Sequence, residues 1–279
     1  MIANATGPRH EVGVAVGLTR VLDKRNEFRA MGIAMAEFDR FAGAYDGGMS
    51  HPLKRLLGAS HEQYLAVKAR WLLRYIKQRV AGAGRSAPRM LDYGCGTGLL
   101  LECLHRMGWR GELHGCDVSQ AMIRQAVQPG VAELRHLKRG TLPYAVGQFD
   151  LVVICCVLHH TGPEEAAEMV RQARRVLGPG GHLVVFEHNP RNPLTRLVVR
   201  QTPIDQGARL VGPPRVRALM RAAGFRRIAT RYLMFLPPRW PRLAGVERLL
   251  AYCPLGGQYA VAGTAGQPRG RNHKIHEIR

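Results

Sequence analysis

Met90-Leu-Asp-Tyr-Gly-Cys-Gly-Thr-Gly98 is the stretch of this sequence that decides the fold. A short apolar run ends at Asp92, three glycines follow at alternate positions, and helical spacing of apolar residues begins at Leu99. Glycine lets a backbone approach a ligand closely because it has no Cβ. A helix that begins directly after the turn points free N–H groups and its positive dipole end at the same place. The stretch therefore predicts a strand, a turn and a helix around a small, polar or partly anionic ligand.

Two common nucleotide-binding loops do not fit this turn. The dinucleotide fingerprint G-x-G-x-x-G requires a third glycine at the position that Leu99 occupies. The Walker A loop requires Gly-Lys followed by Ser or Thr, and this tripeptide does not follow the turn. What remains is an acidic residue, Asp92, followed by G-x-G-x-G. An NAD-dependent oxidoreductase is therefore disfavoured.

A second acidic residue lies at the end of the next predicted strand. The segment Gly111–Ser119 contains a strand that ends at Asp117, which is 19 residues after Gly98. An acid about 20 residues beyond the glycines of a βαβ unit binds ribose, because a carboxylate accepts the two hydrogen bonds that a diol donates. The alternative is a surface aspartate that caps a helix beginning near Ser119. The glycine turn and the spacing together favour the ribose role.

A third predicted strand is followed by two histidines. Phe149–Val157 is apolar almost throughout, as in a parallel strand that helices cover on both faces. Ligands of open α/β sheets bind beyond the carboxyl ends of the strands. His159 and His160 are therefore expected at the ligand-binding edge of the sheet.

The remaining elements alternate as a doubly wound sheet requires. The Gly178-Pro-Gly-Gly181 segment is a predicted turn between a helix and a strand. Three further helices and three further strands are predicted from apolar spacing and from proline and glycine positions. The predicted helices cover His61–Val80, Glu164–Leu177 and Pro213–Ala223, and the predicted strands cover His182–Glu187, Phe225–Leu236 and Gln258–Ala262.

Three of these motifs resemble those of a known family. The acid before G-x-G-x-G, the Phe149-Asp-Leu-Val strand with its Leu-His-His end, and the string Val176–Glu187 are similar to class I S-adenosylmethionine-dependent methyltransferases of the small-molecule type. The resemblance covers about residues 38–263 and is strongest over 88–188. It implies an α/β fold with a doubly wound, Rossmann-like sheet of seven strands, mostly parallel with an antiparallel last strand, and helices on both faces. It also implies S-adenosylmethionine as the cofactor.

The resemblance assigns cofactor-binding roles along the chain. Asp92 and the glycine turn are expected to hold the methionine end and Asp117 the ribose. Tyr45, in a helix over Glu37–Asp46, is expected to close over the cofactor or to pack that helix. The expected cofactor-binding residues are Tyr45, Asp92, Gly94, Cys95, Gly96, Gly98, Asp117, Val118, Met122, Thr141, Leu142 and Cys155.

One part of the family pattern is missing. Many relatives place an acid a few residues before a Leu-Pro pair, where it reaches the adenine amino group. Here Lys138-Arg-Gly-Thr141 precedes Leu142, and no carboxylate is present. Adenine recognition is therefore expected to depend on backbone groups, on Thr141 and Leu142, and on Val118 and Met122 along the adenine face.

Composition limits the cellular setting. The chain has 279 residues, of which 46% are hydrophobic, and this suits one domain with additions and a sizeable core. No apolar run reaches the roughly 20 residues of a membrane span, and the N-terminus lacks a signal-peptide pattern. None of the six cysteines forms a C-x-x-C pair. The sequence therefore predicts reduced thiols, a cytoplasmic location, no transmembrane segment and no metal.

The net charge of +21 has two explanations. A strongly basic chain favours nucleic acid or a membrane surface as a partner. However, the arginines are spread along the sequence and lysines are rare, as expected from a GC-rich coding sequence. Two alternative functions stay open: an RNA methyltransferase that uses the positive surface, and a non-catalytic cofactor-binding module, which would suit the missing adenine acid.

The chain is expected to contain one core with additions. A helical cap precedes the core, and two loops of the core are long enough to cover a substrate. The expected regions are an N-terminal extension (1–34), the N-terminal helical cap (35–87), the methyltransferase core (88–263) with substrate-cap insertions at 189–215 and 237–257, and a basic tail (264–279) that is expected to be disordered.

Three histidines are the expected catalytic residues. Methyl transfer to a hydroxyl or phenol is helped by a base, and histidine has a suitable pKa of about 6.5. His160, His159 and His188 all follow predicted strands on the cofactor side. The alternative is that His159 packs in the core while His160 shapes the pocket.

The acceptor is expected to be a small molecule. Enzymes that methylate exocyclic amines of bases carry [DN]-P-P-[YF] after this strand, and cytosine-C5 enzymes carry a Pro-Cys nucleophile. Here the strand ends in Cys155-Cys-Val-Leu158. The sequence therefore predicts S-adenosylmethionine-dependent methyl transfer to a hydrophobic or phenolic small molecule, at oxygen rather than carbon or nitrogen, with nucleic acid not favoured as the partner.

Overall fold

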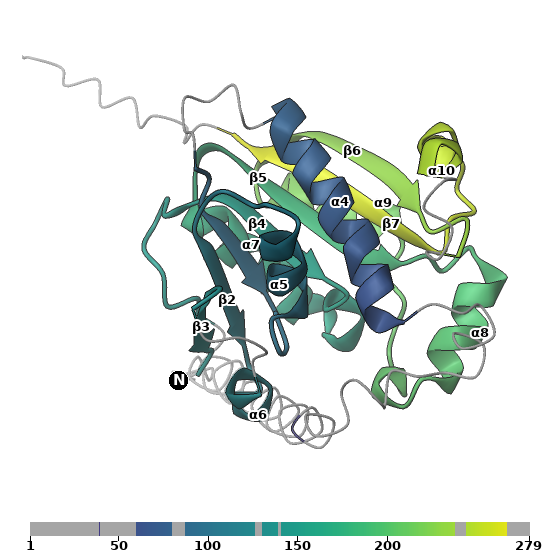
Figure 1. Cartoon of the computed structure of the whole chain (residues 1–279), viewed down its shortest axis with the longest axis horizontal. Helices are drawn as coiled ribbons and strands as arrows, with labels where there is room; N and C mark the ends of the chain where they lie inside the picture. Colours follow the sequence, from purple (N-terminus) through teal and green to yellow (C-terminus); the bar gives the residue numbers. More distant parts are fainter. Residues whose placement is uncertain are drawn as a thin grey trace, which may run out of the picture.

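Figure 1 shows the computed structural model of the chain, which describes Asp39 and residues 60–79, 87–125, 130–138, 141–237 and 244–266. Within these residues the helices are α4 (His61–Arg79), α5 (Leu99–Arg106), α6 (Gln120–Arg124), α7 (Pro163–Val176), α8 (Pro193–Gln201), α9 (Pro213–Ala222) and α10 (Ala244–Leu249). The strands are β1 (Met90–Tyr93), β2 (Leu113–Asp117), β3 (Glu133–His136), β4 (Phe149–Cys155), β5 (Leu177–His188), β6 (Phe225–Leu233) and β7 (Gln258–Ala265). Short 3₁₀ turns are η3 (Leu158–His160), η4 (Pro203–Asp205) and η6 (Leu250–Tyr252).

Seven strands form one sheet in the order β3-β2-β1-β4-β5-β7-β6. Strands β1 to β5 pair in parallel, and β7 runs antiparallel between β5 and β6. Helices α4 and α5 cover one face, and α7 and α9 cover the other (Figure 1). In β4, Leu151 and Val153 pack on the α4–α5 side, while Val152 and Ile154 pack on the α7–α9 side. The predicted fold class is confirmed.

The strand register brings the polar strand ends to one edge of the sheet. Asp92 in β1 pairs with Gly115 in β2 and with Val153 in β4. Cys155, at the end of β4, pairs with Phe186 in β5. In parallel strands this alignment places every carboxyl end on the same side, which is where α/β sheets bind ligands.

The turn after β1 requires glycine. Gly94, Gly96 and Gly98 have φ values of 86°, 54° and 80°, which side chains other than glycine rarely adopt. A Cβ at Gly94 would lie 2.5 Å from Cγ2 of Val157. Gly98 is the residue before the first turn of α5, so the chain enters the helix in a left-handed conformation.

Most predicted elements are present within one to three residues of their expected bounds. The helix expected to begin at Leu99 does so, and the strand expected to end at Asp117 is β2. Apolar periodicity within one element was enough to place α4, α7, α9 and β4. Gly224, with a φ of 85°, ends α9 as predicted.

Four elements differ from the sequence predictions. Strand β5 begins at Leu177 rather than His182, because Leu177 already pairs with Phe149 of β4. The register then shifts, and regular pairing resumes at His182 after the predicted glycine turn. Helix α8 lies in a segment expected to be loop, where Asn192 and a proline at the first helical position start a helix. Strand β3 was not predicted. Strand β7 ends at Ala265, beyond the expected core boundary at 263.

The two predicted insertions contact each other through asparagine side chains. The Asn189 side-chain amide is buried and donates to the carbonyls of Pro254 (2.9 Å) and Gly256 (2.7 Å). Asn192 donates to the carbonyl of Leu255 at 2.7 Å. The segments near residues 190 and 255 are therefore in direct contact, beside the end of β5 and the start of β7.

Several predictions concern residues that the structure does not describe. The extension over 1–34, Tyr45, and the tail after residue 266 lie outside the described residues. Of the helix predicted over Glu37–Asp46, only Asp39 is described, and it is helical. The domain boundaries stay a prediction. Among the described helices, none is both long enough and apolar enough to cross a membrane.

Candidate active site

The glycine turn is joined to the end of β2 by backbone hydrogen bonds. The N–H groups of Gly94 and Cys95 donate to the carbonyl of Cys116, at 2.8 and 3.1 Å. The N–H of Gly96 donates to Oδ2 of Asp117 at 2.8 Å, and the N–H of Ser119 donates to Oδ1 at 2.8 Å. Asp117 therefore fixes the turn that surrounds it.

Asp117 keeps the capacity to bind a further donor. An ionised carboxylate has about four acceptor positions, and the two backbone bonds use one on each oxygen. Burial raises the pKa of Asp117, although the two backbone donors oppose that effect. Ser119 rather than Asp117 caps α6, since its hydroxyl accepts from the N–H of Met122 at 3.1 Å. The helix-capping alternative for Asp117 is therefore disfavoured, and its ribose role stays a prediction.

Asp92 is a buried acid with one unused oxygen. Its side chain is 1% exposed, and Oδ1 has no hydrogen-bond partner among the described residues. Burial and the nearby Asp117 carboxylate together raise its pKa to about 7. A buried acceptor without a donor is costly. A cationic ligand group beside Asp92 would remove that cost, which fits the ammonium of a methionine-like ligand end.

The residues expected around adenine differ in how accessible they are to a ligand. Val118 is half-buried, and its carbonyl lies 3.0 Å from Nε2 of His136. Met122 and Leu142 are buried, and the Leu142 side chain packs in the core on the α7–α9 side. Thr141 is exposed. The adenine roles of these residues stay predictions.

Asp39 contacts the same edge from the N-terminal region. Its Oδ1 accepts from the hydroxyl of Ser119 and, at 3.4 Å, from the N–H of Ala121. Because Ser119 is two residues after Asp117, the contact places a helical residue of the predicted cap beside the ribose-binding candidate.

A buried lysine lies beside the cysteines that follow β4. Nζ of Lys68, on α4, is 3.3 Å from Sγ of both Cys155 and Cys156. A hydrogen bond from the Cys156 thiol and the Lys68 charge lower the pKa of Cys155 despite burial. Cys156 has a φ of 57°, an uncommon conformation for a residue with a side chain. All six cysteines, each within the described residues, are free.

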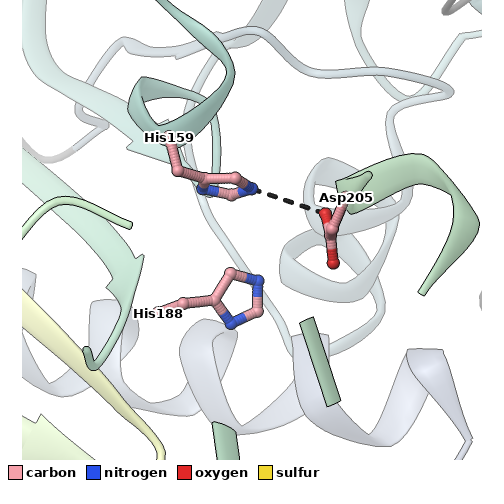
Figure 2. Close-up of side chains that lie close together, drawn as sticks. All are labelled: His159, His188 and Asp205. Atoms are coloured by element: carbon pink, nitrogen blue, oxygen red, sulfur yellow. Dashed lines mark ion pairs between the residues drawn. The ribbon is translucent and has the colours of Figure 1, made fainter. Parts of the chain in front are cut away.

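Three histidines and two acids converge beyond β4 and β5. Nδ1 of His159 lies 2.6 Å from Oε2 of Glu187. Nε2 of the same ring lies 3.5 Å from Oδ1 of Asp205, the ion pair that Figure 2 marks with a dashed line. Nε2 of His160 is also 3.5 Å from Oδ1 of Asp205. The ring centroids of His159 and His188 are 5.0 Å apart. We call these five residues the histidine cluster.

The two inner histidines differ in charge. Burial alone would lower the pKa of His159, but Glu187 and Asp205 raise it to about 10. Burial and the neighbouring His159 charge lower the pKa of His188 to about 3. Its Nδ1 lies 3.3 Å from the side-chain nitrogen of Gln258. His159 is therefore protonated near neutral pH and His188 is neutral, a separation typical of functional sites.

Glu187 and Asp205 are held as carboxylates. Glu187 is fully buried and accepts from the N–H of Leu158 at 2.7 Å as well as from His159. His159 lowers its pKa against the opposing effect of burial. The imidazoles of His159 and His160, each 3.5 Å from Oδ1, hold the pKa of Asp205 far below its usual range, although burial opposes them.

The sequence pointed to the histidines but not to their partners. Glu187 ends an apolar strand, and an acid at that position is a signal that could have identified it. Lys68 lies on the apolar face of α4 with Leu65 and Leu72, which is an unusual place for lysine. Asp205 has no such signal, because only the path of the 189–215 segment brings it to His159.

A large groove lies elsewhere on the molecule. It has a volume of about 1020 Å³ and is lined by residues of α4, β6 and the α10 region. None of its lining residues is a predicted site residue. Arginines line it together with Trp71 and Tyr75; they are Arg70, Arg74, Arg79, Arg227, Arg231 and Arg248.

Comparison with known proteins yields a consistent group of relatives. A family model described as "Methyltransferase domain" matches residues 91–185. The chain is 32% identical to a ubiquinone/menaquinone biosynthesis C-methyltransferase of Syntrophotalea carbinolica, over 56% of this chain and 62% of that protein. It is 30% identical to a ubiquinone biosynthesis O-methyltransferase of Cereibacter sphaeroides, over 60% of this chain and 76% of that protein. The chain thus spans less than two thirds of the first of these relatives.

A solved structure has the same fold. A methyltransferase of Thermotoga maritima, described as S-adenosylmethionine-dependent and as a possible histamine N-methyltransferase, superposes with a TM-score of 0.56. The alignment covers 82% of this chain and 99% of that chain at 18% sequence identity. This likeness concerns the fold alone.

Proposed function

The chain belongs to the class I S-adenosylmethionine-dependent methyltransferases, and from this membership we propose that it methylates the oxygen of a small phenolic acceptor. The observation that carries the proposal is the histidine cluster. It lies at the carboxyl ends of β4 and β5, on the same edge of the sheet as the glycine turn. Acceptor and methyl donor can therefore meet there.

The residues near the glycine turn suit S-adenosylmethionine. Asp92 offers an unused buried oxygen for the ammonium, and Asp117 offers its remaining acceptor positions for the ribose diol. When bound, this cofactor supplies a methyl carbon that an acceptor oxygen takes as the carbon–sulfur bond breaks, which leaves S-adenosylhomocysteine and one proton from the acceptor. The protein must position the acceptor, exclude water and receive that proton.

His160 is the proton acceptor in this proposal. It is more exposed than His159, with 16% of its side chain accessible, so it can face both the acceptor and solvent. Asp205, 3.5 Å away, orients its ring and stabilises the charge that it gains. His159 already carries a proton between two carboxylates, so its role is to stabilise the developing phenolate.

The relatives support a phenolic acceptor. Two of the similar proteins are named for methylation at oxygen or carbon in quinone biosynthesis. A phenol offers both kinds of atom, and deprotonation activates either.

The free thiols and the missing membrane-spanning helix among the described residues are consistent with a cytoplasmic location, which belongs to the same proposal. The RNA and non-catalytic alternatives are not favoured.

The test uses labelled cofactor with a panel of catechols and phenols. We expect an O-methylated product by mass spectrometry. The variant His160→Asn should lower kcat by about 10²–10⁴-fold while S-adenosylhomocysteine binding stays unchanged. The fall in kcat should be smaller for acceptors with more acidic hydroxyls, because their deprotonation needs less help from a base. Label found only on carbon, or an equal loss for acidic and ordinary phenols, would contradict the proposal.

A further inference from the structure

Three members of the histidine cluster present donor atoms to one point. Ring nitrogens of His159 and His188 and a carboxylate oxygen of Asp205 all lie within 4.8 Å of one another. Figure 2 shows one nitrogen of each ring turned to the carboxylate. The residues come from three separate segments, namely η3 after β4, the end of β5, and η4.

One of these donors is buried and has no hydrogen-bond partner. His159 is 2% exposed, and its Nε2 forms no hydrogen bond within the described part of the chain. The other nitrogen of this ring is held by Glu187 at 2.6 Å. A histidine that ligates a metal is commonly oriented in this way, by a carboxylate on its second nitrogen.

His188 has a matching partner in Gln258. The Gln258 side-chain nitrogen lies 3.3 Å from Nδ1 of His188, while its Oε1 has no hydrogen-bond partner among the described residues. Rotating this amide by half a turn would let Nδ1 donate to Oε1, because the oxygen and nitrogen ends of an amide occupy nearly the same space. Nε2 of His188 would then be unprotonated and could ligate a cation.

We propose that His159, His188 and Asp205 bind a divalent cation of the zinc and iron class, which replaces the proton on Nε2 of His159. Metal binding commonly releases a proton from a ligand in this way, and the cation then supplies the positive charge that the protonated ring supplies in its absence. Imidazole nitrogens suit these metals, and two histidines with one carboxylate leave coordination positions open for a further ligand. In tetrahedral coordination, bonds of about 2.0–2.2 Å place the donor atoms about 3.3–3.6 Å apart. Nε2 of His159 and Oδ1 of Asp205, at 3.5 Å, already approach that spacing.

The absence of a C-x-x-C pair does not argue against this site. That spacing identifies thiolate zinc sites, whereas these ligands are distant in sequence and meet only in the fold. The open positions would hold the oxygen of a phenolic acceptor and stabilise it as phenolate. This role, though not the binding of the cation, rests on the proposed function.

Cobalt(II) is the probe for the test. The full chain is treated with chelator, freed of it under reducing conditions and titrated with Co²⁺, whose visible absorption reports coordination. We expect one saturable equivalent that Zn²⁺ displaces. Affinity should fall at least tenfold in His188→Ala and in Asp205→Asn, and about 10–100-fold in Glu187→Gln. His105→Ala, which removes an exposed histidine on α5, is the matched control and should not change it.

Two controls keep the result unambiguous. Cys155→Ser must leave the absorption unchanged, because a thiolate-to-cobalt band that vanishes there would assign the ion to the cysteines and overturn the site. S-adenosylhomocysteine binding confirms that each variant is folded, and Asp205→Asn keeps the side-chain shape if His188→Ala unfolds. Absence of saturable binding, or equal affinity in the ligand variants, would also overturn it. No acceptor or methyl donor is present in the titration, so its outcome is independent of methyl transfer.

Discussion

At the scale of single residues, the glycine turn combines two separate constraints. Gly94 has a φ of 86° and lies against Val157, where a Cβ would come within 2.5 Å of Cγ2. Gly108 has the same φ, but a Cβ there would meet no atom of the described residues within 4 Å. Alanine substitution at Gly108 therefore tests the backbone conformation alone, whereas substitution at Gly94 tests that conformation together with the contact to Val157.

We predict that Gly94→Ala is clearly more destabilising than Gly108→Ala. The left-handed conformation alone should cost about 1–2 kcal/mol in Gly108→Ala. The contact with Val157 should add about 1–3 kcal/mol in Gly94→Ala. Urea unfolding of both variants measures the difference, and S-adenosylhomocysteine calorimetry should show weaker binding only for Gly94→Ala. Equal free energies of unfolding would show that Val157 moves aside without cost.

Asp92 predicts a particular pH dependence of stability. Its pKa is raised from 3.8 to about 7 by burial and by Asp117, so the folded state disfavours its ionised form. Between about pH 4 and pH 7 the folded state binds more protons than the unfolded state, and the free energy of unfolding therefore falls as pH rises. In the wild type this decrease in the free energy of unfolding is at most about 4 kcal/mol across the range. In Asp92→Asn the decrease should be absent.

Denaturant unfolding at pH 4.5, near the start of this change, and at pH 8, beyond its end, measures this effect. The wild type should lose more stability between the two values than Asp92→Asn does. Cofactor binding should change in the opposite direction, since ionised Asp92 attracts an ammonium group. An identical pH dependence in the two proteins would show that Asp92 titrates normally.

At the scale of elements, the segment from Asn189 to Asp205 decides whether the histidine cluster is complete. Asn189 is buried, accepts from the N–H of Arg191 at 3.1 Å and donates to two carbonyls of the Pro254–Gly256 segment. Asn192 starts α8 by accepting from the N–H of Thr195 at 2.9 Å. The helix and η4 then carry Asp205 back to His159.

We predict that Asn189→Ala costs more stability than Asn192→Ala. The first change leaves the buried carbonyl of Gly256 without this donor, at about 1–3 kcal/mol, and also removes the hydrogen bond to the carbonyl of Pro254. The second removes a helix cap that is partly exposed, at about 1 kcal/mol. Thermal or urea unfolding ranks the two. The reverse order would mean that the contact between the insertions contributes little.

These elements also show where sequence reasoning succeeds. Apolar spacing within one segment placed α4, α5, α7 and β4, because each buries a face that its own sequence displays. Strand β3 was missed, since its four residues are partly exposed at the sheet edge. Asp205 was missed because its importance arises from a contact between segments far apart in sequence. The histidines were found because strand ends are recognisable locally, and their catalytic role stays a prediction.

At the scale of the whole molecule, part of the positive charge gathers in one groove. The groove between α4, β6 and α10 brings six arginines together. Burial and the neighbouring Arg248 and Arg70 lower the pKa of Arg74. Like charges at such distances repel each other, and dissolved salt screens that repulsion.

We predict that sodium chloride raises the thermal unfolding midpoint between low and moderate ionic strength. Arg74→Gln should raise the midpoint at low salt and flatten its dependence on salt. Arg171→Gln is the matched control, because Arg171 pairs with Glu168 at 2.7 Å on α7 and its removal should not flatten the dependence. A midpoint that falls with salt in the wild type would contradict the proposed repulsion.

The position of β7 has a consequence for synthesis on the ribosome. This strand lies between β5 and β6, and its first residue, Gln258, lies beside His188 and Cys156. Until residues 258–265 leave the exit tunnel, β5 and β6 cannot join and both expose unpaired edges. We therefore expect an interval during synthesis in which β1 to β4 can pair while the edge of β5 that carries His188 has no neighbouring strand. During that interval, chaperones have an open strand edge to protect.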